Sequence, residues 1–317
     1  MGGAEYHVPV LLGEVLELFV SDRPGVYVDG TLGGGGHFRA IGERAGRCSE
    51  KGAPVVMIGI DRDAEAVEKA RRSSFDGLGA EVIIERSRFS EFDAVLGKHN
   101  IEKVQGLFVD LGVSSRQIDE PGRGFMYMRE APLDMRMDQS AGITAAEFLE
   151  QCGEGELSEI LEKYGEIRNA PRLAGAIKAD MVDNEIKTSA DLRNCVTREY
   201  GERVDIKLLA KLFQALRISV NGELAELKTF LDKSVNYLCK GGRVAVISYH
   251  SLEDRMVKDF FRDAEASCVC DPNQPVCTCD KQVLLRRVNR KALTASDEEI
   301  KRNPRARSAR LRVAERC

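Results

Sequence analysis

A run of four glycines, Gly33–Gly36, separates two segments rich in β-branched residues, and each segment ends in an acid. The first segment ends at Asp29, and the second, residues 55–61, ends at Asp61. Four consecutive glycines suit a tight turn where the backbone approaches a ligand closely. In a strand–turn–helix–strand unit, an acid at the tip of the second strand is placed to accept hydrogen bonds from ribose hydroxyls. The glycines alone fit a plain turn equally well, but together with Asp61 they favour a nucleoside-containing ligand.

The glycine spacing also bears on which nucleoside the turn would accept. The spacing from Gly30 to Gly36 does not match the dinucleotide fingerprint. Asp29, directly before the turn, would repel a pyrophosphate but can pair with a cation. S-adenosylmethionine carries an amino group and a sulfonium and has no phosphate, so the residues favour it over NAD.

Two more polar side chains follow predicted strands. Residues 104–110 are nearly all apolar, as buried parallel strands are, and they end on Asp110. Residues 243–248 form a further predicted strand, and His250 follows it. The carboxyl ends of such strands face the ligand crevice. Because a buried unpaired carboxylate is costly, we expect Asp110 to have a polar partner or a chemical task. His250 fits a structural role and a catalytic role equally well.

Four cysteines stand in two Cys-x-Cys pairs within residues 268–279, namely Cys268, Cys270, Cys277 and Cys279. Four thiols across a short loop can hold one tetrahedral zinc ion. A reduced surface loop is the alternative, since the spacing is not the usual Cys-x-x-Cys. The nine cysteines of the chain are odd in number and mostly scattered, which indicates a reducing compartment. With no signal peptide and no apolar run of about 20 residues, we expect a cytoplasmic protein without a membrane segment.

The charge of the chain is nearly balanced. Its 317 residues include 47 Lys and Arg against 51 Asp and Glu, for a formal charge of -4. Net charge therefore does not indicate a nucleic-acid binder. Near the C-terminus, however, basic residues gather with few acids between them: Arg286, Arg287, Arg290, Lys291, Lys301, Arg302, Arg305, Arg307, Arg310 and Arg312. This basic C-terminal segment suits phosphate contacts, with a solvated charged face as the alternative.

The hydrophobic pattern predicts the elements that position these residues. Strands are expected at residues 26–29, 55–61, 81–85, 104–110, 243–248, 282–288 and 308–314. Helices are expected at residues 12–19, 63–73, 156–164, 171–181, 188–200, 207–218, 223–238 and 257–264, with another opened by a capping box at Thr144 and Glu147. Asn221 is the predicted N-cap of the helix at 223–238, and Gly241 and Gly242 its predicted end.

Between residues 116 and 205 the pattern contains no convincing strand. We therefore predict an α/β domain in two parts, 1–115 and 206–317, with a helical domain at 116–205 inserted between them. Arg123, Arg129 and Arg136 lie in an irregular, Arg- and Met-rich segment of this insertion. We expect the insertion and the basic C-terminal segment to grip RNA.

An ordered set of motifs resembles one family, the small-subunit ribosomal RNA cytidine N(4)-methyltransferases, known as methyltransferase H. The motifs run from the N-terminus to the C-terminus in the family's order, which makes the set far more specific than any one of them. They are His7-Val8-Pro9-Val10-Leu11-Leu12, Asp29-Gly30-Thr31 with Gly35-Gly36-His37, Ile60-Asp61-Arg62-Asp63, Asp110-Leu111-Gly112-Val113-Ser114-Ser115, Gly124-Phe125, Pro132-Leu133-Asp134-Met135-Arg136-Met137, Phe213-Gln214-Ala215-Leu216-Arg217-Ile218, His250-Ser251-Leu252-Glu253-Asp254-Arg255 and Asn303-Pro304-Arg305-Ala306-Arg307-Ser308.

The resemblance implies a class I S-adenosylmethionine-dependent methyltransferase fold, a Rossmann-like and mostly parallel sheet with an inserted helical domain. It implies that the substrate is a cytidine in the decoding region of 16S RNA in the small ribosomal subunit. The cofactor contacts of the family map onto Gly35, Gly36, His37, Asp61, Phe89, Asp110 and Gln117. By its position alone, Phe89 is equally suited to stacking on adenine and to ordinary core packing.

The exocyclic amine of cytidine is a poor nucleophile, because its lone pair is delocalised into the ring. Attack on a sulfonium methyl therefore needs an in-line approach and acceptors that localise the lone pair. Asp110 and the backbone carbonyls of Leu111 to Val113 are the candidate acceptors, and no cysteine stands at the end of this predicted strand that could form a covalent adduct for ring-carbon methylation. The alternatives are a nicotinamide-dependent oxidoreductase and a non-catalytic RNA-binding assembly factor. The oligomeric state, including a homodimer, stays open.

Overall fold

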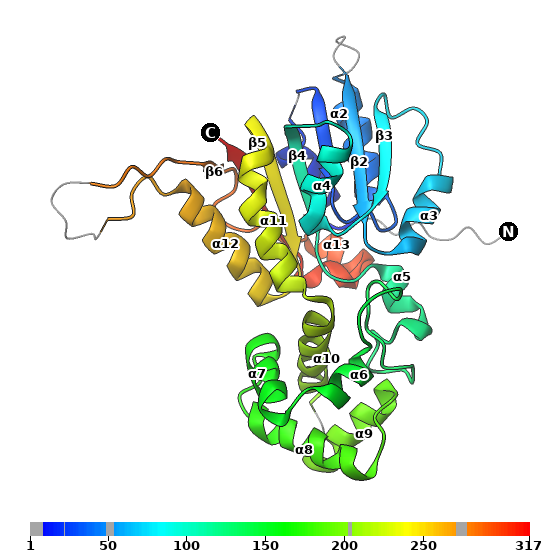
Figure 1. The fold of residues 1–317 in the computed structure, drawn as a ribbon. Helices are drawn as coiled ribbons and strands as arrows, with labels where there is room; N and C mark the ends of the chain where they lie inside the picture. Colours follow the sequence, from blue (N-terminus) through cyan, green and yellow to red (C-terminus); the bar gives the residue numbers. More distant parts are fainter. Residues whose placement is uncertain (1–8, 22, 49–53, 202–204, 271–277) are drawn as a thin grey trace. The chain divides into compact units, whose positions relative to one another are not determined.

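The computed structural model describes residues 9–21, 23–48, 54–201, 205–270 and 278–317 (Figure 1). The chain divides into two compact units. The first consists of Met1–Gly112 and Ala225–Cys317, and the second of Val113–Leu224. Each unit has its own apolar core, so each is described by itself.

The first unit is built on a seven-stranded sheet with the order β3-β2-β1-β4-β5-β7-β6. The strands are β1 (Gly25–Asp29), β2 (Val55–Asp61), β3 (Glu81–Arg86), β4 (Val104–Asp110), β5 (Leu238–Ser248), β6 (Leu285–Arg287) and β7 (Arg310–Arg316). Strands β1 to β5 pair in parallel, whereas β7 is antiparallel to both β5 and β6. This order, with its antiparallel β7, is that of the class I methyltransferase fold, and it confirms the predicted fold class.

Helices line both faces of this sheet, because neighbouring residues of a strand point to opposite sides. Tyr27 and Phe108 belong to one apolar cluster, while Val28 and Leu107 belong to another. The helices of this unit are α1 (Leu12–Leu18), α2 (Gly36–Gly46), α3 (Ala64–Arg72), α4 (Phe92–Lys98), α11 (Glu223–Tyr237, from Ala225 on), α12 (Ser251–Glu265) and α13 (Asp297–Arg302), with short 3-10 turns η2 (Phe89–Glu91) and η4 (Pro304–Ser308). The first cluster takes in residues of α1 and α2, and the second takes in residues of α4, α11 and α12.

The predicted end of α11 at Gly241 and Gly242 is wrong. The helix ends at Tyr237, and β5 begins at the next residue, Leu238, which is buried and pairs with Val104. The register then shifts, and the two glycines lie in this irregular stretch of β5, where Gly241 has a φ of 77°. Here the glycines accommodate a bulge rather than a helix terminus.

The second unit is helical. Its elements are α5 (Ser115–Asp119), η3 (Pro121–Arg123), α6 (Ala145–Gln151), α7 (Glu154–Gly165), α8 (Ala170–Asp183), α9 (Ser189–Tyr200) and α10 (Ile206–Asn221). Among the residues described between 113 and 224, the only β pairing is an isolated bridge of Pro132 with Thr188. The capping box of Thr144 and Glu147 opens α6, as predicted. Buried apolar residues of α6 to α10 form one core.

The predicted role of Asn221 as an N-cap is also wrong. Asn221 is the last residue of α10, and its side chain is buried. Its amide donates to Met135 O at 2.8 Å, and its Oδ1 accepts from Met137 N at 2.8 Å. The side chain therefore holds the irregular segment before α6 against α10, a long-range task that local pattern does not reveal. None of the helices in the described part of the chain combines the length and apolar character needed to span a bilayer.

Candidate active site

Three aspartates end three adjacent parallel strands. Asp29 ends β1, Asp61 ends β2 and Asp110 ends β4, and the strand order places β1 between the other two. Because parallel strands share one direction, the three carboxylates meet at the same edge of the sheet. The sequence predicted this edge as the ligand crevice, and the structure brings the predicted residues Asp61 and Asp110 together there.

The glycine turn leaves β1 at this same edge. Gly30 N donates to Phe108 O at 2.8 Å, which anchors the start of the turn to β4. A Cβ at Gly30 would lie only 2.9 Å from both the Phe89 Cβ and a Val109 methyl, so the approach requires glycine. Gly35 is the N-cap of α2. Its φ of 76° is a left-handed backbone conformation, which glycine adopts without strain.

Gly36, the first residue of α2, is enclosed for a different reason. A Cβ there would lie 2.5 Å from Pro9 Cγ. At Gly30 and Gly36, neighbouring side chains therefore leave no room for a Cβ. A cavity of 320 Å³ adjoins the turn, lined by Gly33–Gly36 and by side chains that include Phe75, Arg39 and Lys69. Within the described residues, this lining comes from the turn, from α1 to α3 and from residues next to α1 and α3, and the three aspartates do not contribute to it.

Asp61 ties the second strand to the turn. Its Oδ2 accepts from Gly33 N and its Oδ1 from Asp63 N, both at 2.8 Å. Burial raises the pKa of Asp61 to about 6, although these two backbone hydrogen bonds oppose the rise. Since a carboxylate offers about four acceptor sites, Asp61 can still accept hydrogen bonds from a ribose.

Asp29 is the most deeply buried of the three acids, with a relative exposure of 1%. Its Oδ1 accepts from Thr31 N at 3.0 Å. Its Oδ2 has no hydrogen-bond partner among the described residues. Burial raises the pKa of Asp29 to about 7, and repulsion from Asp110 and Asp61 adds to the rise. A buried carboxylate oxygen without a partner is costly, so this atom suits a cationic or hydrogen-bond-donating ligand.

Asp110 has partners from three parts of the first unit. Its backbone N donates to Thr31 Oγ1 at 2.7 Å, and its Oδ1 accepts from the Tyr249 hydroxyl at 2.9 Å. Its Oδ2 lies 3.6 Å from His37 Nδ1. Burial raises the pKa of Asp110 to about 7, and the hydrogen bond from Tyr249 opposes the rise. The side chain remains 24% exposed, so a ligand can reach it.

Sequence reasoning missed Tyr249 as a functional residue. The side chain is the hydrogen-bond donor to Asp110, and burial raises the pKa of Tyr249 above its usual value. Tyr249 directly follows β5, which pairs with β4 through Ile247 and Asp110. Its position at the end of a predicted neighbouring strand was the available signal.

His37, a predicted cofactor contact, is buried beside Asp110. Its Nε2 lies 2.9 Å from Val10 O, and its ring centroid lies 4.9 Å from that of Phe108. These contacts hold the ring at the start of α2 and turn its Nδ1 toward Asp110. His37 therefore lies beside the Asp110 carboxylate at the end of the turn.

Phe89 and Gln117 occupy different settings. Phe89 begins η2 after β3, is partly buried, and meets Phe230 edge-on with ring centroids 5.7 Å apart. Gln117 belongs to the second unit, where its Oε1 accepts from Ser114 N at 3.0 Å in a capping box. The contacts of both residues with a cofactor stay predictions.

His250 is the N-cap of α12. Its Nδ1 accepts from Glu253 N at 3.4 Å, and its Nε2 lies 3.1 Å from the Glu253 carboxylate. The carboxylate of Glu253 also accepts from Tyr249 N at 2.9 Å. His250 thus helps to hold the backbone next to Tyr249, and its predicted catalytic role stays a prediction.

Two of the arginines expected to grip RNA have partners within the second unit. Arg123 is 4% exposed, and its guanidinium donates to Arg136 O and Met137 O. Arg136 forms a two-pronged ion pair with Asp134. Both guanidinium groups therefore fasten their own segment, whereas Arg129 is exposed. The sequence pattern could not distinguish arginines that bind within their own segment from exposed ones, because these hydrogen bonds and ion pairs depend on how the loop folds.

Three of the four predicted metal-binding cysteines, Cys268, Cys270 and Cys279, lie together after α12. Cys277 lies outside the described residues.

Comparison with known proteins agrees with this geometry. A family model described as the MraW methylase family matches residues 4–317. A protein of Heliobacterium mobile named "Ribosomal RNA small subunit methyltransferase H" is 41% identical over 321 residues, covering 98% of this chain and 99% of its own. Proteins with the same name are 43% identical in Syntrophotalea carbinolica, with 98% of each chain covered, and 41% identical in Caldicellulosiruptor saccharolyticus, with 98% and 99% covered.

Proposed function

The chain belongs to the MraW methylase family, and from this premise we propose that it methylates the exocyclic N4 amine of a cytidine in 16S ribosomal RNA. S-adenosylmethionine is the proposed methyl donor, and the small ribosomal subunit is the proposed partner. The target lies in the decoding region, as the family resemblance implies. The single observation that carries the proposal is the row of Asp29, Asp61 and Asp110 around the glycine turn.

The residues at this edge fit S-adenosylmethionine. The partnerless Oδ2 of Asp29 suits the donor's ammonium group, and Asp61 suits its ribose hydroxyls. A pyrophosphate would instead lie beside three carboxylates and be repelled by them. The pKa of each carboxyl group is already raised, and additional negative charge would raise it further. When bound, the cofactor supplies an electrophilic methyl group on a sulfonium.

Asp110 is the proposed acceptor for the target amine. Methyl transfer forms an N4–CH₃ bond, breaks the CH₃–S bond and leaves the electron pair on sulfur, and N4 then sheds one proton. A pKa near 7 suits a group that must accept a proton near neutral pH. Tyr249 holds the carboxylate through a hydrogen bond, so that it faces the amine without reorganising, and His37 lies beside it.

The remaining assignments are part of the same proposal. Gly35, Gly36, His37, Phe89 and Gln117 contact the cofactor, and His250 acts beside Asp110 at the strand ends. The protein works in the cytoplasm, where its RNA substrate resides. A structural zinc ion, argued separately below, is not needed for this chemistry.

The test is methylation of small subunits that lack the modification, using isotopically labelled S-adenosylmethionine. The RNA is then digested to nucleosides and analysed by mass spectrometry. We expect one labelled N4-methylcytidine per subunit. Label on the cytosine ring carbon or on a ribose would contradict the proposed target atom. Absence of any label would favour a non-catalytic RNA-binding protein.

A second measurement separates the proposal from a nicotinamide-dependent enzyme. A ligand that binds only the folded state raises the unfolding temperature. We expect S-adenosylhomocysteine to raise it and NAD to leave it unchanged. The opposite result would favour the oxidoreductase.

A further inference from the structure

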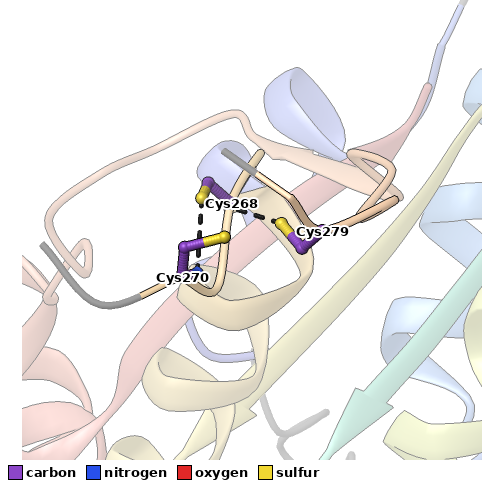
Figure 2. Close-up of side chains that lie close together, drawn as sticks. All are labelled: Cys268, Cys270 and Cys279. Carbon is purple, nitrogen blue, oxygen red and sulfur yellow. Dashed lines mark hydrogen bonds between the residues drawn. The ribbon is translucent and has the colours of Figure 1, made fainter. Parts of the chain in front are cut away.

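Three cysteine thiols gather after α12, outside the site described above. Cys268, Cys270 and Cys279 offer sulfur atoms that all lie within 4.8 Å of one another (Figure 2). Cys268 and Cys270 follow the end of α12, while Cys279 lies on the returning part of the chain before β6. Residues separated in sequence thus converge on one point.

The spacing of the sulfur atoms fits a shared metal ion. Cys268 Sγ and Cys279 Sγ are 3.7 Å apart. Two thiolates on one tetrahedral zinc, each at about 2.3 Å, lie about 3.8 Å from each other. A disulfide would instead require about 2.05 Å and would leave the third thiol without a role.

Backbone amides donate hydrogen bonds to two of these three sulfur atoms. Val269 N donates to Cys279 Sγ at 3.4 Å, and Cys270 N donates to Cys268 Sγ at 3.3 Å. Hydrogen bonds from backbone N–H groups stabilise thiolate charge and orient metal ligands. Figure 2 shows the three side chains grouped around this backbone.

Among the residues described around the cluster, none of residues 268–270 and 278–279 belongs to an apolar core that would explain the convergence. Val269, between two of the cysteines, is 64% exposed. The segment between α12 and β6 is closed where it leaves and rejoins these two elements. There, Leu284 N donates to Ala264 O at 2.9 Å, and Arg287 forms an ion pair with Glu265. Beyond this closure, the contact between the sulfur atoms of Cys268 and Cys279 and the hydrogen bond from Val269 N to Cys279 Sγ join the outgoing to the returning chain.

We propose that Cys268, Cys270 and Cys279 bind one zinc ion that cross-links the segment between α12 and β6. Soft thiolates select zinc over hard cations such as Mg²⁺ and Ca²⁺. The fourth coordination position is left to another ligand. Cys277 lies outside the described residues and forms no part of the argument. The site is structural and independent of the methyl-transfer proposal.

The test uses the full chain, purified without a metal-chelating tag and kept reduced. We expect about one equivalent of zinc per chain by elemental analysis. Cys268→Ser and Cys279→Ser should each lower the zinc content at least about fivefold, since a thiolate ligand is lost. Cys317→Ser is the matched control, because Cys317 is also an exposed cysteine but lies outside the cluster; it should keep the full equivalent.

A measurement on the unmodified protein covers the case in which a variant fails to fold. Native protein is alkylated with and without a zinc chelator, and the modified cysteines are mapped by mass spectrometry. We expect the three thiols to be protected until the chelator is added, with Cys317 reactive throughout. No zinc after reconstitution, a different metal at one equivalent, a disulfide within the cluster, or equal reactivity with and without chelator would each overturn the proposal.

Discussion

The Tyr249 hydroxyl donates a hydrogen bond to Asp110 Oδ1 across 2.9 Å, and this bond joins the ends of β5 and β4. On the other side of the same carboxylate, His37 Nδ1 lies 3.6 Å from Oδ2. Asp110 is thus held by Tyr249, lies beside His37 and stays partly exposed. A fixed acceptor aimed at one point is what transfer to a weakly nucleophilic amine requires.

Asp110→Asn should reduce the rate of methyl transfer much more than it weakens cofactor binding. A charge-assisted hydrogen bond in a water-excluded site contributes roughly 2–4 kcal/mol to the transition state, so a loss of about a hundredfold or more is expected. Single-turnover methylation gives the rate, and calorimetry gives cofactor affinity. Asp61→Asn is the matched control, expected mainly to weaken cofactor binding. If Asp110→Asn loses affinity in full proportion to rate, Asp110 only binds the cofactor.

Tyr249→Phe should slow the reaction about tenfold near pH 7, the effect of losing one hydrogen bond to a charged group. The bond from Tyr249 opposes the burial that raises the pKa of Asp110, so its loss should raise that pKa further. The acidic limb of the pH–rate profile should therefore move to higher pH. The measurement is single-turnover methylation across the pH range. If the rate falls but the pH–rate profile does not shift, Tyr249 contributes only packing and does not affect the pKa of Asp110.

Cofactor affinity should rise from about pH 5.5 to about pH 7.5, because Asp29 must ionise to receive the ammonium group of the cofactor. The pKa of Asp29 is raised in the folded protein to about 7, and the pKa values of Asp61 and Asp110 are raised to about 6 and about 7. The pKa of such an acid is higher in the folded than in the unfolded protein. Its contribution to folding stability is therefore fully present below pH 3.8, the pKa of the unfolded state, and is lost as the pH rises through about 7.

The increase in unfolding temperature caused by S-adenosylhomocysteine should therefore grow with pH over this interval. Thermal unfolding at several pH values, with and without the ligand, measures it. Asp29→Asn is the control and should flatten the pH dependence. An increase that is constant with pH would contradict the assignment of the ammonium group to Asp29.

Exposed cations of the basic C-terminal segment should carry the salt dependence of subunit binding. Lys301 and Arg307 are exposed, whereas Arg312 is 7% exposed and pairs with Asp254. Replacing Lys301 and Arg307 with alanine should lower the slope of log affinity against log salt by about two if each contacts a phosphate. Lys228→Ala with Arg72→Ala removes the same charge from exposed helix positions and should leave the slope unchanged. Equal slopes for both double variants would exclude the segment from the RNA interface.

The sequence by itself determined the strands and helices that carry the site. Residues 104–110 are so uniformly apolar that they had to form a buried strand, and Asp110 had to stand at its end. Likewise, four glycines between two strands could only be a turn. Such features depend on near neighbours along the chain, which pattern and propensity describe well.

Only the tertiary structure decided which groups meet across long separations. Asp110 and Tyr249 are 139 residues apart, and their contact depends on the pairing of β4 with β5. Asn221 looked like a helix cap but holds a loop 86 residues away at Met135. The missing partner of Asp29 Oδ2 follows from burial, which no local pattern reports. In each case the role of a polar side chain depends on contacts that exist only after the sheet and the helical core have formed. Burial makes a polar group without a hydrogen-bond partner costly, so the folded surroundings determine what each side chain binds.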